Sequence, residues 1–440
     1  MYSNKHIWQI TYPVVLTLLA QNLVNVTDSA FLGRVGEVEL GASALAGVFY
    51  MSVFVVGMGF STGSQILIGR RNGEQNYLQI GEVFNQGMLF IFLLAMAVFG
   101  LCFFFAEPLL HSFIHSEAVY KATVRYLDFR IYGFFFAFVN MMFRAFYVGV
   151  MRTKVLTLSA FITTGVNVVL NYSLIFGHFG LPKMGIGGAA LASVIAEACT
   201  LVFYMIYTRK TVDISRYGLF IFRRLNMETV RQILDISFYI MLQIFLAVST
   251  WFIFFMFIEQ TGERPLAISN IVRSLYSLLG LPVIAFSVTI STMVSNLMGE
   301  GRTDEVLPTI RKQLKMACIA VTPVAIITAL FPAAFASIYT DNSSLIADTI
   351  PTLYVFCGVL FAFAFGNIYS SALSGTGNTR MVLLFDASVL VVYMAYIYLV
   401  NFVFHWPVHI AWLSEFVYWL GVGSCSYLYF RFGKWRARKI

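Results

Sequence analysis

The sequence predicts an all-α integral membrane protein with twelve transmembrane helices in two repeated six-helix bundles. Three observations lead to this fold. Of the 440 residues, 59% are apolar and only 11% are charged, whereas a soluble domain has about 25% charged residues. Apolar runs long enough to cross about 30 Å of hydrocarbon follow one another along the whole chain. Several landmarks of the first half also recur in the second half at one constant spacing.

Polar residues, glycines and prolines separate the apolar segments from one another. In chain order, the predicted helices are 7–32, 42–68, 83–106, 126–150, 155–176, 186–208, 230–258, 266–298, 312–337, 350–374, 379–403 and 408–431. The longest polar stretch follows the sixth of them. We therefore expect an N-terminal lobe at residues 1–208, a cytoplasmic connecting loop at 209–229 and a C-terminal lobe at 230–440.

Basic residues predict the orientation of these helices. When the N-terminus is placed in the cytoplasm, most of the 29 Lys and Arg residues fall on the cytoplasmic side, in keeping with the positive-inside rule. The outer side then receives Arg34, Lys121, Arg125, Arg130, Lys183 and Arg264, and Arg273 falls within a helix. We expect a multi-pass protein of the cell (inner) membrane with both termini in the cytoplasm. The net charge of +8 then reflects topology, and no nucleic-acid partner is expected.

An internal repeat predicts the two bundles. At an offset of 226 residues, Gly36-Glu37 aligns with Gly262-Glu263, and Gly73-Glu74 aligns with Gly299-Glu300. Further aligned pairs are Tyr50 with Tyr276, Phe60-Ser61 with Phe286-Ser287, and Thr153-Lys154 with Thr379-Arg380. Because each half has an even number of helices, both halves are expected to cross the membrane in the same direction.

The first helix carries an aspartate within its apolar run. A carboxylate there costs about 2.5–3.5 kcal/mol to insert, so Asp28 is expected to face a bundle interior or a watery cavity. Gln21, Asn25 and Asp28 are spaced i, i+4, i+7 and share one face of the helix. In the fifth helix, Asn167 and Asn171 also share a face, at a depth similar to that of Asp28.

These residues predict a cation or proton site in the N-terminal lobe. The amide oxygens of Asn167 and Asn171 and the Asp28 carboxylate suit the all-oxygen shell of a hard cation. A proton would compete with that cation, because both neutralise the same carboxylate. Ser193 and Glu197, one turn apart on the sixth helix, are expected to help, although Glu197 is as readily explained by pairing with a buried donor. The alternative for the whole set is a network that only holds three helices together.

Several kinds of chemistry lack the motifs that they require. The sequence contains no GxxxxGK(S/T) loop for nucleotide phosphates, no HExxH or CxxC metal motif and no GxSxG elbow. Its five cysteines show no paired spacing, and its six histidines lie at the chain end or in predicted connections. We therefore expect no enzyme activity, no metal centre and no cofactor. Two repeated bundles with buried polar groups and no nucleotide site predict a secondary transporter.

Four stretches carry a resemblance to a known family that covers essentially the whole chain. They are Thr27–Gly36 (TDSAFLGRVG), Asn167–Gly177 (NVVLNYSLIFG), Gly187–Ser193 (GGAALAS) and Leu373–Arg380 (LSGTGNTR). These stretches resemble the multidrug and toxic compound extrusion (MATE) transporters. The resemblance implies a MATE/MOP-type fold with two six-helix lobes around a central cavity. It also implies an antiporter that exports cationic amphiphilic drugs and toxins in exchange for Na+ or H+, by alternating access of the lobes.

Within that family the chain is most similar to the damage-inducible (DinF) type, whose cation site lies in the N-terminal lobe. Asp28, Gln21 and Pro13 match residues of that branch, and Pro13 is expected to kink the first helix. The fifth-helix pair departs from the branch, which has asparagine and then aspartate where this chain has Asn167 and Asn171. The branch that couples through a seventh-helix glutamate is disfavoured, because the apolar part of that helix has no acidic residue here.

Two further groups of intramembrane residues are candidates for function. Asp386 and Glu415, in the eleventh and twelfth helices, form either a second protonation or substrate site or a set of structural hydrogen bonds. Aromatic rings that line the cavity would attract organic cations. The candidates for this role are Tyr50, Tyr132, Tyr276 and Tyr369.

Two alternative functions stay open. A flippase for a lipid-linked or amphiphilic precursor belongs to the same wider superfamily, but an anionic lipid substrate requires basic residues in the cavity. Only Arg273 is clearly intramembrane. A membrane enzyme would need a catalytic constellation, which the sequence does not contain. We expect small organic cations and membrane lipid as partners, and a monomeric protein.

Overall fold

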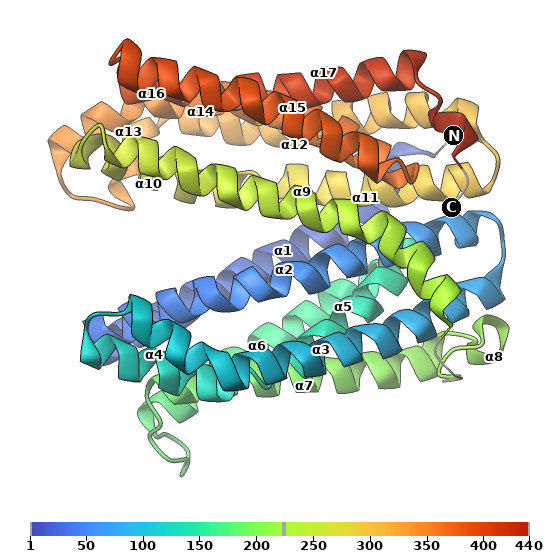
Figure 1. The fold of residues 1–440 in the computed structure, drawn as a ribbon, viewed down its shortest axis with the longest axis horizontal. Helices are drawn as coiled ribbons and strands as arrows, with labels where there is room; N and C mark the ends of the chain where they lie inside the picture. The colour runs from blue at the N-terminus through green and yellow to red at the C-terminus, as the bar shows by residue number, and fades with distance from the viewer. Residues whose placement is uncertain (1, 222–225, 439–440) are drawn as a thin grey trace. The chain divides into compact units, whose positions relative to one another are not determined.

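The computed structural model describes residues 2–221 and 226–438, and their regular structure is entirely helical (Figure 1). The helices of the first half are α1 (Asn4–Val35), α2 (Glu37–Gly73), α3 (Tyr77–Phe113), α4 (Glu117–Arg130), α5 (Gly133–Gly149), α6 (Lys154–Phe176), α7 (Ile186–Thr211) and α8 (Ile214–Tyr217). Those of the second half are α9 (Met227–Glu259), α10 (Glu263–Leu279), α11 (Leu281–Gly299), α12 (Val306–Leu330), α13 (Pro332–Ser337), α14 (Ser343–Gly375), α15 (Thr379–Tyr398), α16 (Val408–Ala411) and α17 (Ser414–Phe432). Short 3-10 helices at Thr303–Glu305 and Trp435–Ala437 and a π-helical turn at Leu399–Val403 complete the set.

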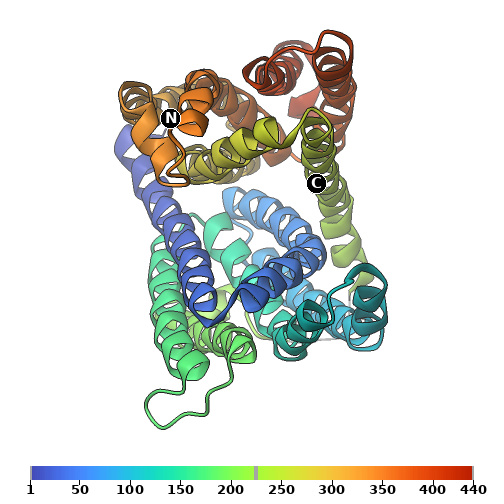
Figure 2. The same ribbon diagram turned by 90° about the vertical axis from the view of Figure 1, so that its left-hand side faces the viewer.

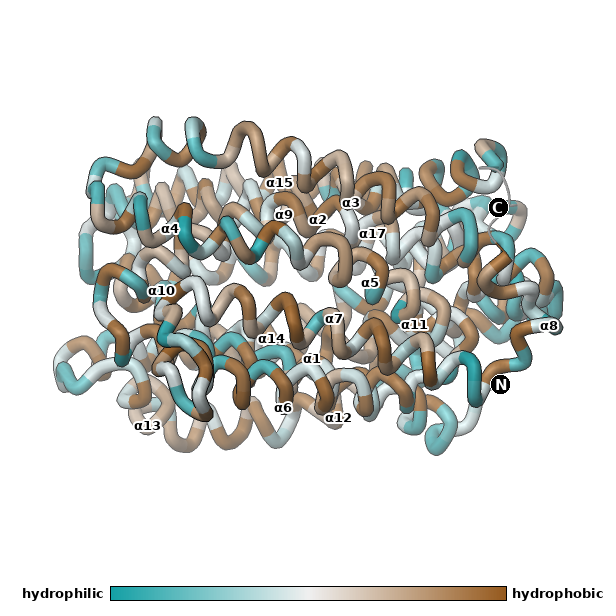
Figure 3. Tube along the Cα trace, turned by 90° about the horizontal axis from the view of Figure 1, so that it is seen from below, coloured by the Kyte–Doolittle hydropathy of each residue, from teal (hydrophilic) through white to brown (hydrophobic). Residues whose placement is uncertain are grey.

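The all-helical membrane fold predicted from the sequence is confirmed. Within the described residues, ten helices are long and apolar enough to cross a membrane, or eleven when α4 and α5 count as one span. Figure 3 shows hydrophobic residues along the middle of the helices and hydrophilic residues gathered towards their ends. The predicted twelfth segment is helical as α17 but is not among those spans. Its serines, glycines and Glu415 make it less apolar than the others.

Two predicted segments are interrupted. The fourth consists of α4 and α5, which meet at an angle of 51°. The eighth divides into α10 and α11 at Gly280. Pro282 explains this break, because proline has no N–H to donate to the carbonyl of Leu278 four residues earlier. The Gly280 N–H donates to the Tyr276 carbonyl, four residues earlier, at 3.0 Å.

Contacts divide the chain into two compact units. The N-terminal unit is Tyr12–Met241, and the C-terminal unit combines Met1–Thr11 with Leu242–Ile440. The sequence-based lobes, 1–208 and 230–440, differ from these units because α1 and α9 each continue from one unit into the other without a break in the helix. The lobe boundaries therefore stay a prediction. Residues 222–225 of the predicted connecting loop lie outside the described residues.

The internal repeat reappears in the structure. Gly36 and Gly262 directly precede α2 and α10, whereas Gly73 and Gly299 end α2 and α11. Residues with left-handed backbone angles also recur at the 226-residue offset, as Gln75 (φ 56°) with Gly301 (φ 74°), Met151 (φ 58°) with Gly377 (φ 86°), and Phe179 (φ 56°) with His405 (φ 50°). Equivalent turns thus join equivalent helices in both halves, which confirms two copies of one bundle.

The close packing of α6 on α7 positions the candidate site. The two helices lie side by side, joined by the loop at residues 177–185 (Figure 2). Gly188 permits this approach, because a Cβ at this position would lie only 2.7 Å from the carbonyl group of Leu174. Five residues further along α7, Ser193 then reaches Asn167 of α6.

Candidate functional site

A chain of side-chain hydrogen bonds joins α1, α6 and α7 inside the N-terminal unit. The Asn171 amide donates to Asp28 Oδ1 and, at 2.9 Å, to Asn167 Oδ1. The Asn167 amide donates in turn to Ser193 Oγ at 3.1 Å. Asn167 and Asn171 are 1% and 0% exposed, and Asp28 is partly buried. The structure therefore brings together four residues that the sequence proposed as one site.

One oxygen of this cluster lacks a partner. Asn171 Oδ1 is buried and accepts no hydrogen bond in the described structure, although buried amide oxygens are normally paired. It belongs to the same side chain that donates to Asp28. A cation bound beside Asp28, or a proton on the Asp28 carboxyl group, would supply the missing partner, and these are the two ligands that the sequence predicted.

Gln21 and Asn25 do not join the cluster. Both are exposed. In the part of the chain that the structure describes, neither side chain bonds to Asp28, Asn167 or Asn171. The helical spacing correctly gives the three α1 residues a common face, but each residue rises about 1.5 Å. Gln21 therefore lies about 10 Å from Asp28 along α1. A shared face does not imply a shared depth.

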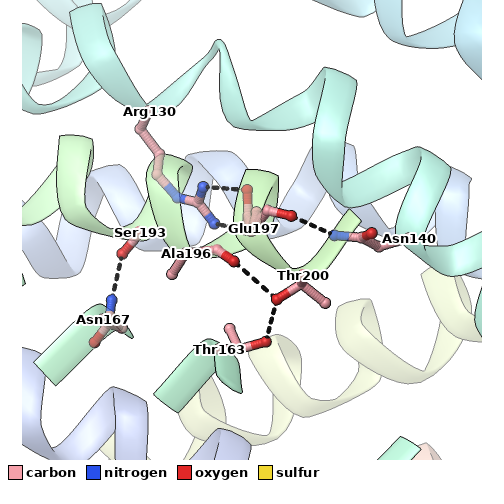
Figure 4. Close-up of polar contacts among 8 residues, drawn as sticks. All are labelled: Arg130, Asn140, Thr163, Asn167, Ser193, Ala196, Glu197 and Thr200. Atoms are coloured by element: carbon pink, nitrogen blue, oxygen red, sulfur yellow. Dashed lines mark hydrogen bonds and ion pairs between the residues drawn. The ribbon is translucent and has the colours of Figure 1, made fainter. Parts of the chain in front are cut away.

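Glu197 forms a mostly buried ion pair, which was the alternative explanation offered for it, with a partner that the sequence did not identify. Its Oε1 and Oε2 accept from the two terminal nitrogens of Arg130 at 2.7 and 3.0 Å (Figure 4). The side chains of Arg130 and Glu197 are only 12% and 17% exposed. Asn140 donates to the Glu197 backbone carbonyl at 2.9 Å. Glu197 shares a face of α7 with Ser193 as expected, but its carboxylate binds an arginine and not Asn167.

Arg130, which the charge pattern placed on the outer side of the membrane, has its side chain paired inside the bundle. It ends α4, at the bend into α5, and its guanidinium lies 4.0 Å from the centre of the Tyr50 ring. Gly133 leaves room for the pair, because a Cβ there would lie 2.3 Å from Arg130 Nη1 and 2.7 Å from Glu197 Oε2. The available signal was that Arg130 falls inside the predicted fourth segment, where a charge needs a partner.

The Arg130 charge also acts on Asp28. The guanidinium lies near enough for a direct electrostatic interaction with the Asp28 carboxylate, while both of its terminal nitrogens are bonded to Glu197. With Asp28 ionised, the three side chains carry two negative charges and one positive charge. One monovalent cation or one proton balances them.

Hydroxyl groups extend this polar region along the α6–α7 contact. Thr163 and Thr200 share a hydrogen bond of 2.6 Å, and Thr200 also donates to the Ala196 carbonyl (Figure 4). Further along, Ser159 bonds to the Tyr204 hydroxyl at 2.8 Å. Such bonds between membrane helices add cohesion, so α6 and α7 are held together from the candidate site onwards.

Pro13 lies inside the continuous helix α1, two residues after its crossing from one unit to the other. Its missing N–H leaves the Gln9 carbonyl without the usual helical partner. The Pro13 carbonyl accepts from Thr17 at 2.8 Å and from Thr157 of α6 at 3.1 Å. The kink proposed from the sequence stays a prediction.

The tyrosines proposed as cavity aromatics lie in varied surroundings. Tyr50 and Tyr369 are 5% and 3% exposed, and Tyr50 stacks on Phe134 with ring centres 4.4 Å apart. Their rings therefore expose little surface in this structure, and a lining role for them stays a prediction. Tyr276 is partly buried and accepts a hydrogen bond from Trp419. Tyr132 is exposed.

Asp386 and Glu415 are both buried in the C-terminal unit, on α15 and α17. Each accepts a hydrogen bond from a tyrosine. Among residues 2–221 and 226–438, no three His, Cys, Asp or Glu side chains gather in a way that could hold a metal ion.

The chain has two repeated bundles of membrane-spanning helices. Within one of them lies a carboxylate cluster whose negative charge is not fully balanced. These features are those of a multi-pass transport protein. The family model described as MatE matches residues 13–173 and 240–399, one block in each half. The chain belongs to the MatE family.

Named relatives support this membership. A probable multidrug resistance protein NorM of Thermotoga maritima is 24% identical over 445 residues, covering 99% of this chain and 94% of the relative. A protein of the same name from Agrobacterium fabrum is 27% identical over 293 residues, covering 66% of this chain and 62% of the relative. The probable multidrug resistance protein YoeA of Bacillus subtilis is 24% identical over 322 residues, covering 70% and 68%.

Solved structures share the fold. A multidrug resistance MATE family transporter of the MOP superfamily, in an outward-facing conformation, matches with a TM-score of 0.89 at 18% identity, over 97% of this chain and 95% of that chain. A MOP superfamily transporter from Pyrococcus furiosus matches with a TM-score of 0.86 at 18% identity, with the same coverage. The predicted MATE/MOP-type fold is confirmed. The DinF-like branch stays a prediction.

Proposed function

We propose that this chain exports cationic amphiphilic organic compounds in exchange for Na+ or H+ bound at Asp28. As a member of the MatE family with relatives named multidrug resistance proteins, the chain is a multidrug efflux transporter. The observation that carries the coupling proposal is the buried cluster of Asp28, Asn171, Asn167 and Ser193, with Arg130 and Glu197 beside it.

The charge balance explains why a monovalent cation belongs there. An uncompensated charge in a low-dielectric interior costs several kcal/mol. Arg130 is engaged by Glu197, so the Asp28 charge is only partly compensated. Binding of Na+ or H+ removes this cost, and a cationic substrate near Asp28 would remove it as well. Cation and substrate therefore exclude one another, which is the requirement for exchange.

The hydrogen-bond chain gives the cation a means to act on the helices. Ionised Asp28 accepts from the Asn171 amide, and that amide also holds Asn167. A protonated Asp28 has an O–H to donate. The unpaired Oδ1 of Asn171, the residue whose amide now donates to Asp28, is an available acceptor for it. Neutralisation of Asp28 thus favours a different orientation of the Asn171 amide, with its oxygen as the acceptor. We propose that this local change biases α1 against α6 and α7 during alternating access of the two lobes.

The flippase alternative finds less support. An anionic lipid headgroup needs arginine or lysine donors that are not already engaged. Arg130, the buried arginine beside the cluster, is held by Glu197, and Arg273 is exposed and lies over the Phe255 ring. We propose small organic cations as substrates, membrane lipid as surroundings and a monomer as the working unit, with no nucleic-acid partner.

Dye transport tests the proposed function. Proteoliposomes that contain the full chain are loaded with ethidium, and an inward Na+ gradient at equal pH is compared with an inward proton gradient without Na+. At least one gradient is expected to accelerate dye efflux, and an ionophore that collapses this gradient should return efflux to the basal rate. If neither gradient accelerates the efflux of ethidium or of tetraphenylphosphonium by correctly folded protein, the proposed coupling is wrong.

The orientation of the chain in the membrane is a separate proposal. We propose that both termini and the connecting loop that contains α8 lie in the cytoplasm of the cell. Lys5, Arg216 and Arg436 are exposed positions in these regions. Cysteines introduced there, in a background without native cysteines, should resist a membrane-impermeant thiol reagent in intact cells and react after lysis. Labelling of all three from outside would invert the topology.

A further inference from the structure

The C-terminal unit buries two carboxylates that have no basic partner among the described residues. Asp386 of α15 is 2% exposed, and Glu415 of α17 is 3% exposed. The groups that face them are tyrosines, a tryptophan and a glutamine, with no Lys, Arg or His. Two negative charges in such surroundings would be costly without a neutralising ligand.

Hydrogen-bond donors surround Glu415. The Tyr393 hydroxyl of α15 donates to Oε1 at 3.1 Å, and Trp419 Nε1 donates to Oε2 at 3.1 Å. The same indole N–H also reaches the Tyr276 hydroxyl of α10 at 2.9 Å. Tyr418 is the remaining ionisable group within electrostatic range of Glu415. The carboxylate thus accepts from aromatic donors of two helices, and Tyr276 of a third helix accepts from one of those donors.

Asp386 is less completely paired. The Tyr418 hydroxyl approaches Oδ1 at 3.5 Å, a weak contact. Oδ2 is buried and has no hydrogen-bond partner. Gln243 of α9 is the other polar side chain that faces this carboxylate. With a weak contact at Oδ1 and no hydrogen bond of normal geometry at Oδ2, this buried carboxylate is incompletely paired, and it marks a position where a bound proton or ion would be stabilised.

The two carboxylates belong to one line of polar groups along α15 and α17. Tyr393 lies seven residues after Asp386, about 10 Å further along α15. The rings of Tyr393 and Tyr418 lie edge to face, with centres 6.0 Å apart. The order along this line is therefore Glu415, Tyr393, Tyr418 and Asp386.

This arrangement is not a copy of the Asp28 cluster. At the repeat offset, the positions of Asp28, Asn167 and Ser193 are occupied by Phe254, Tyr393 and Trp419. The positions that correspond to Asp386 and Glu415 in the first half are Ala160 and Ala189. Tyr393 and Trp419, which donate to Glu415, thus occupy the positions of Asn167 and Ser193, whereas the carboxylates of the two units stand at different positions of the repeat.

We propose that Asp386 and Glu415, linked by Tyr418 and Tyr393, form a second, proton-binding site in the C-terminal unit. A hard metal ion would need several oxygen acceptors around it, whereas the groups that point at Glu415 are O–H and N–H donors. A proton requires only the carboxylates themselves. This site goes beyond the proposed Asp28 coupling and operates on a different set of residues.

Trp419 provides a direct probe of this site. Its indole donates to Glu415, so its fluorescence should respond when that carboxylate gains or loses a proton. The full chain in lipid nanodiscs is titrated with acid and base while tryptophan emission is recorded. We expect a reversible change that disappears in Glu415→Gln and in Trp419→Phe. The change should persist in Trp406→Phe, which removes an exposed tryptophan, and in Asp28→Asn.

Infrared difference spectroscopy supplies a second measurement. The absorption of protonated carboxyl groups in the wild type should decrease in Asp386→Asn, independently of Asp28. The infrared measurement on Asp386→Asn also tests the second site if Glu415→Gln does not fold. A wild-type emission that is independent of pH, or an unchanged carboxyl band in folded Asp386→Asn, would overturn the second site. Neither measurement depends on transport, so failure here leaves the Asp28 proposal untouched.

Discussion

Asp28→Asn is expected to abolish gradient-driven ethidium efflux while the protein still folds. Asparagine nearly keeps the shape of aspartate and can still bond to Asn171, but it carries no charge and binds neither Na+ nor H+ there. Efflux under the gradient that drives the wild type should fall at least about tenfold, which corresponds to about 1.4 kcal/mol in activation free energy. The measurement is dye efflux from proteoliposomes at matched protein content.

Thr27→Val is the matched control for this variant. Thr27 is the preceding residue of α1, and within the described residues its hydroxyl bonds only to backbone carbonyls of its own helix. It should transport at close to the wild-type rate. If folded Asp28→Asn retains wild-type coupled efflux, the cluster only holds helices together, which is the alternative already considered for the sequence.

Removal of one partner of the Arg130–Glu197 pair is expected to give the largest loss of stability. Both side chains are at least four-fifths buried, and a buried charge left without its partner typically costs about 3–5 kcal/mol. Glu197→Gln and Arg130→Gln should each lower the free energy of unfolding by about this amount. The measurement is denaturant unfolding in mixed micelles.

The double variant distinguishes the contribution of the ion pair from general destabilisation by the substitutions. Since it leaves neither Arg130 nor Glu197 without its partner, its loss of stability should be smaller than the sum of the two single losses by roughly 0.5–3 kcal/mol. Glu117→Gln breaks the exposed pair with Lys121 and should change stability by less than about 1 kcal/mol. Strict additivity of Glu197→Gln and Arg130→Gln would show that the ion pair contributes nothing specific.

Much of the site could be predicted because an ionisable or amide residue within an apolar run needs a partner. That reasoning selected Asp28, Asn167, Asn171 and Ser193, which are hydrogen-bonded in the structure. It left Arg130 unidentified, because a basic residue near a segment end also fits the outer side of the membrane. The partner of Arg130 depends on which helices pack together, and residue spacing within one helix does not contain that information.

The fold was predictable to a similar extent. Hydropathy and the repeat gave the helical segments and the two bundles, because both depend on patterns within the chain. The bend between α4 and α5 and the break at Gly280 occur within continuous apolar runs, where hydropathy gives no signal. Pro282 was the local indication of the second interruption. The passage of α1 and α9 between units depends on tertiary contacts alone.

Ion release on substrate binding tests the central claim most directly. Purified protein in a weakly buffered solution receives ethidium while a pH indicator and a Na+ indicator are recorded together. If cation and substrate exclude one another at Asp28, each lowers the affinity of the other, so the wild type should release H+ or Na+ as the dye binds. Asp28→Asn should bind the dye without that release. Release from Asp28→Asn equal to that from the wild type would contradict the account.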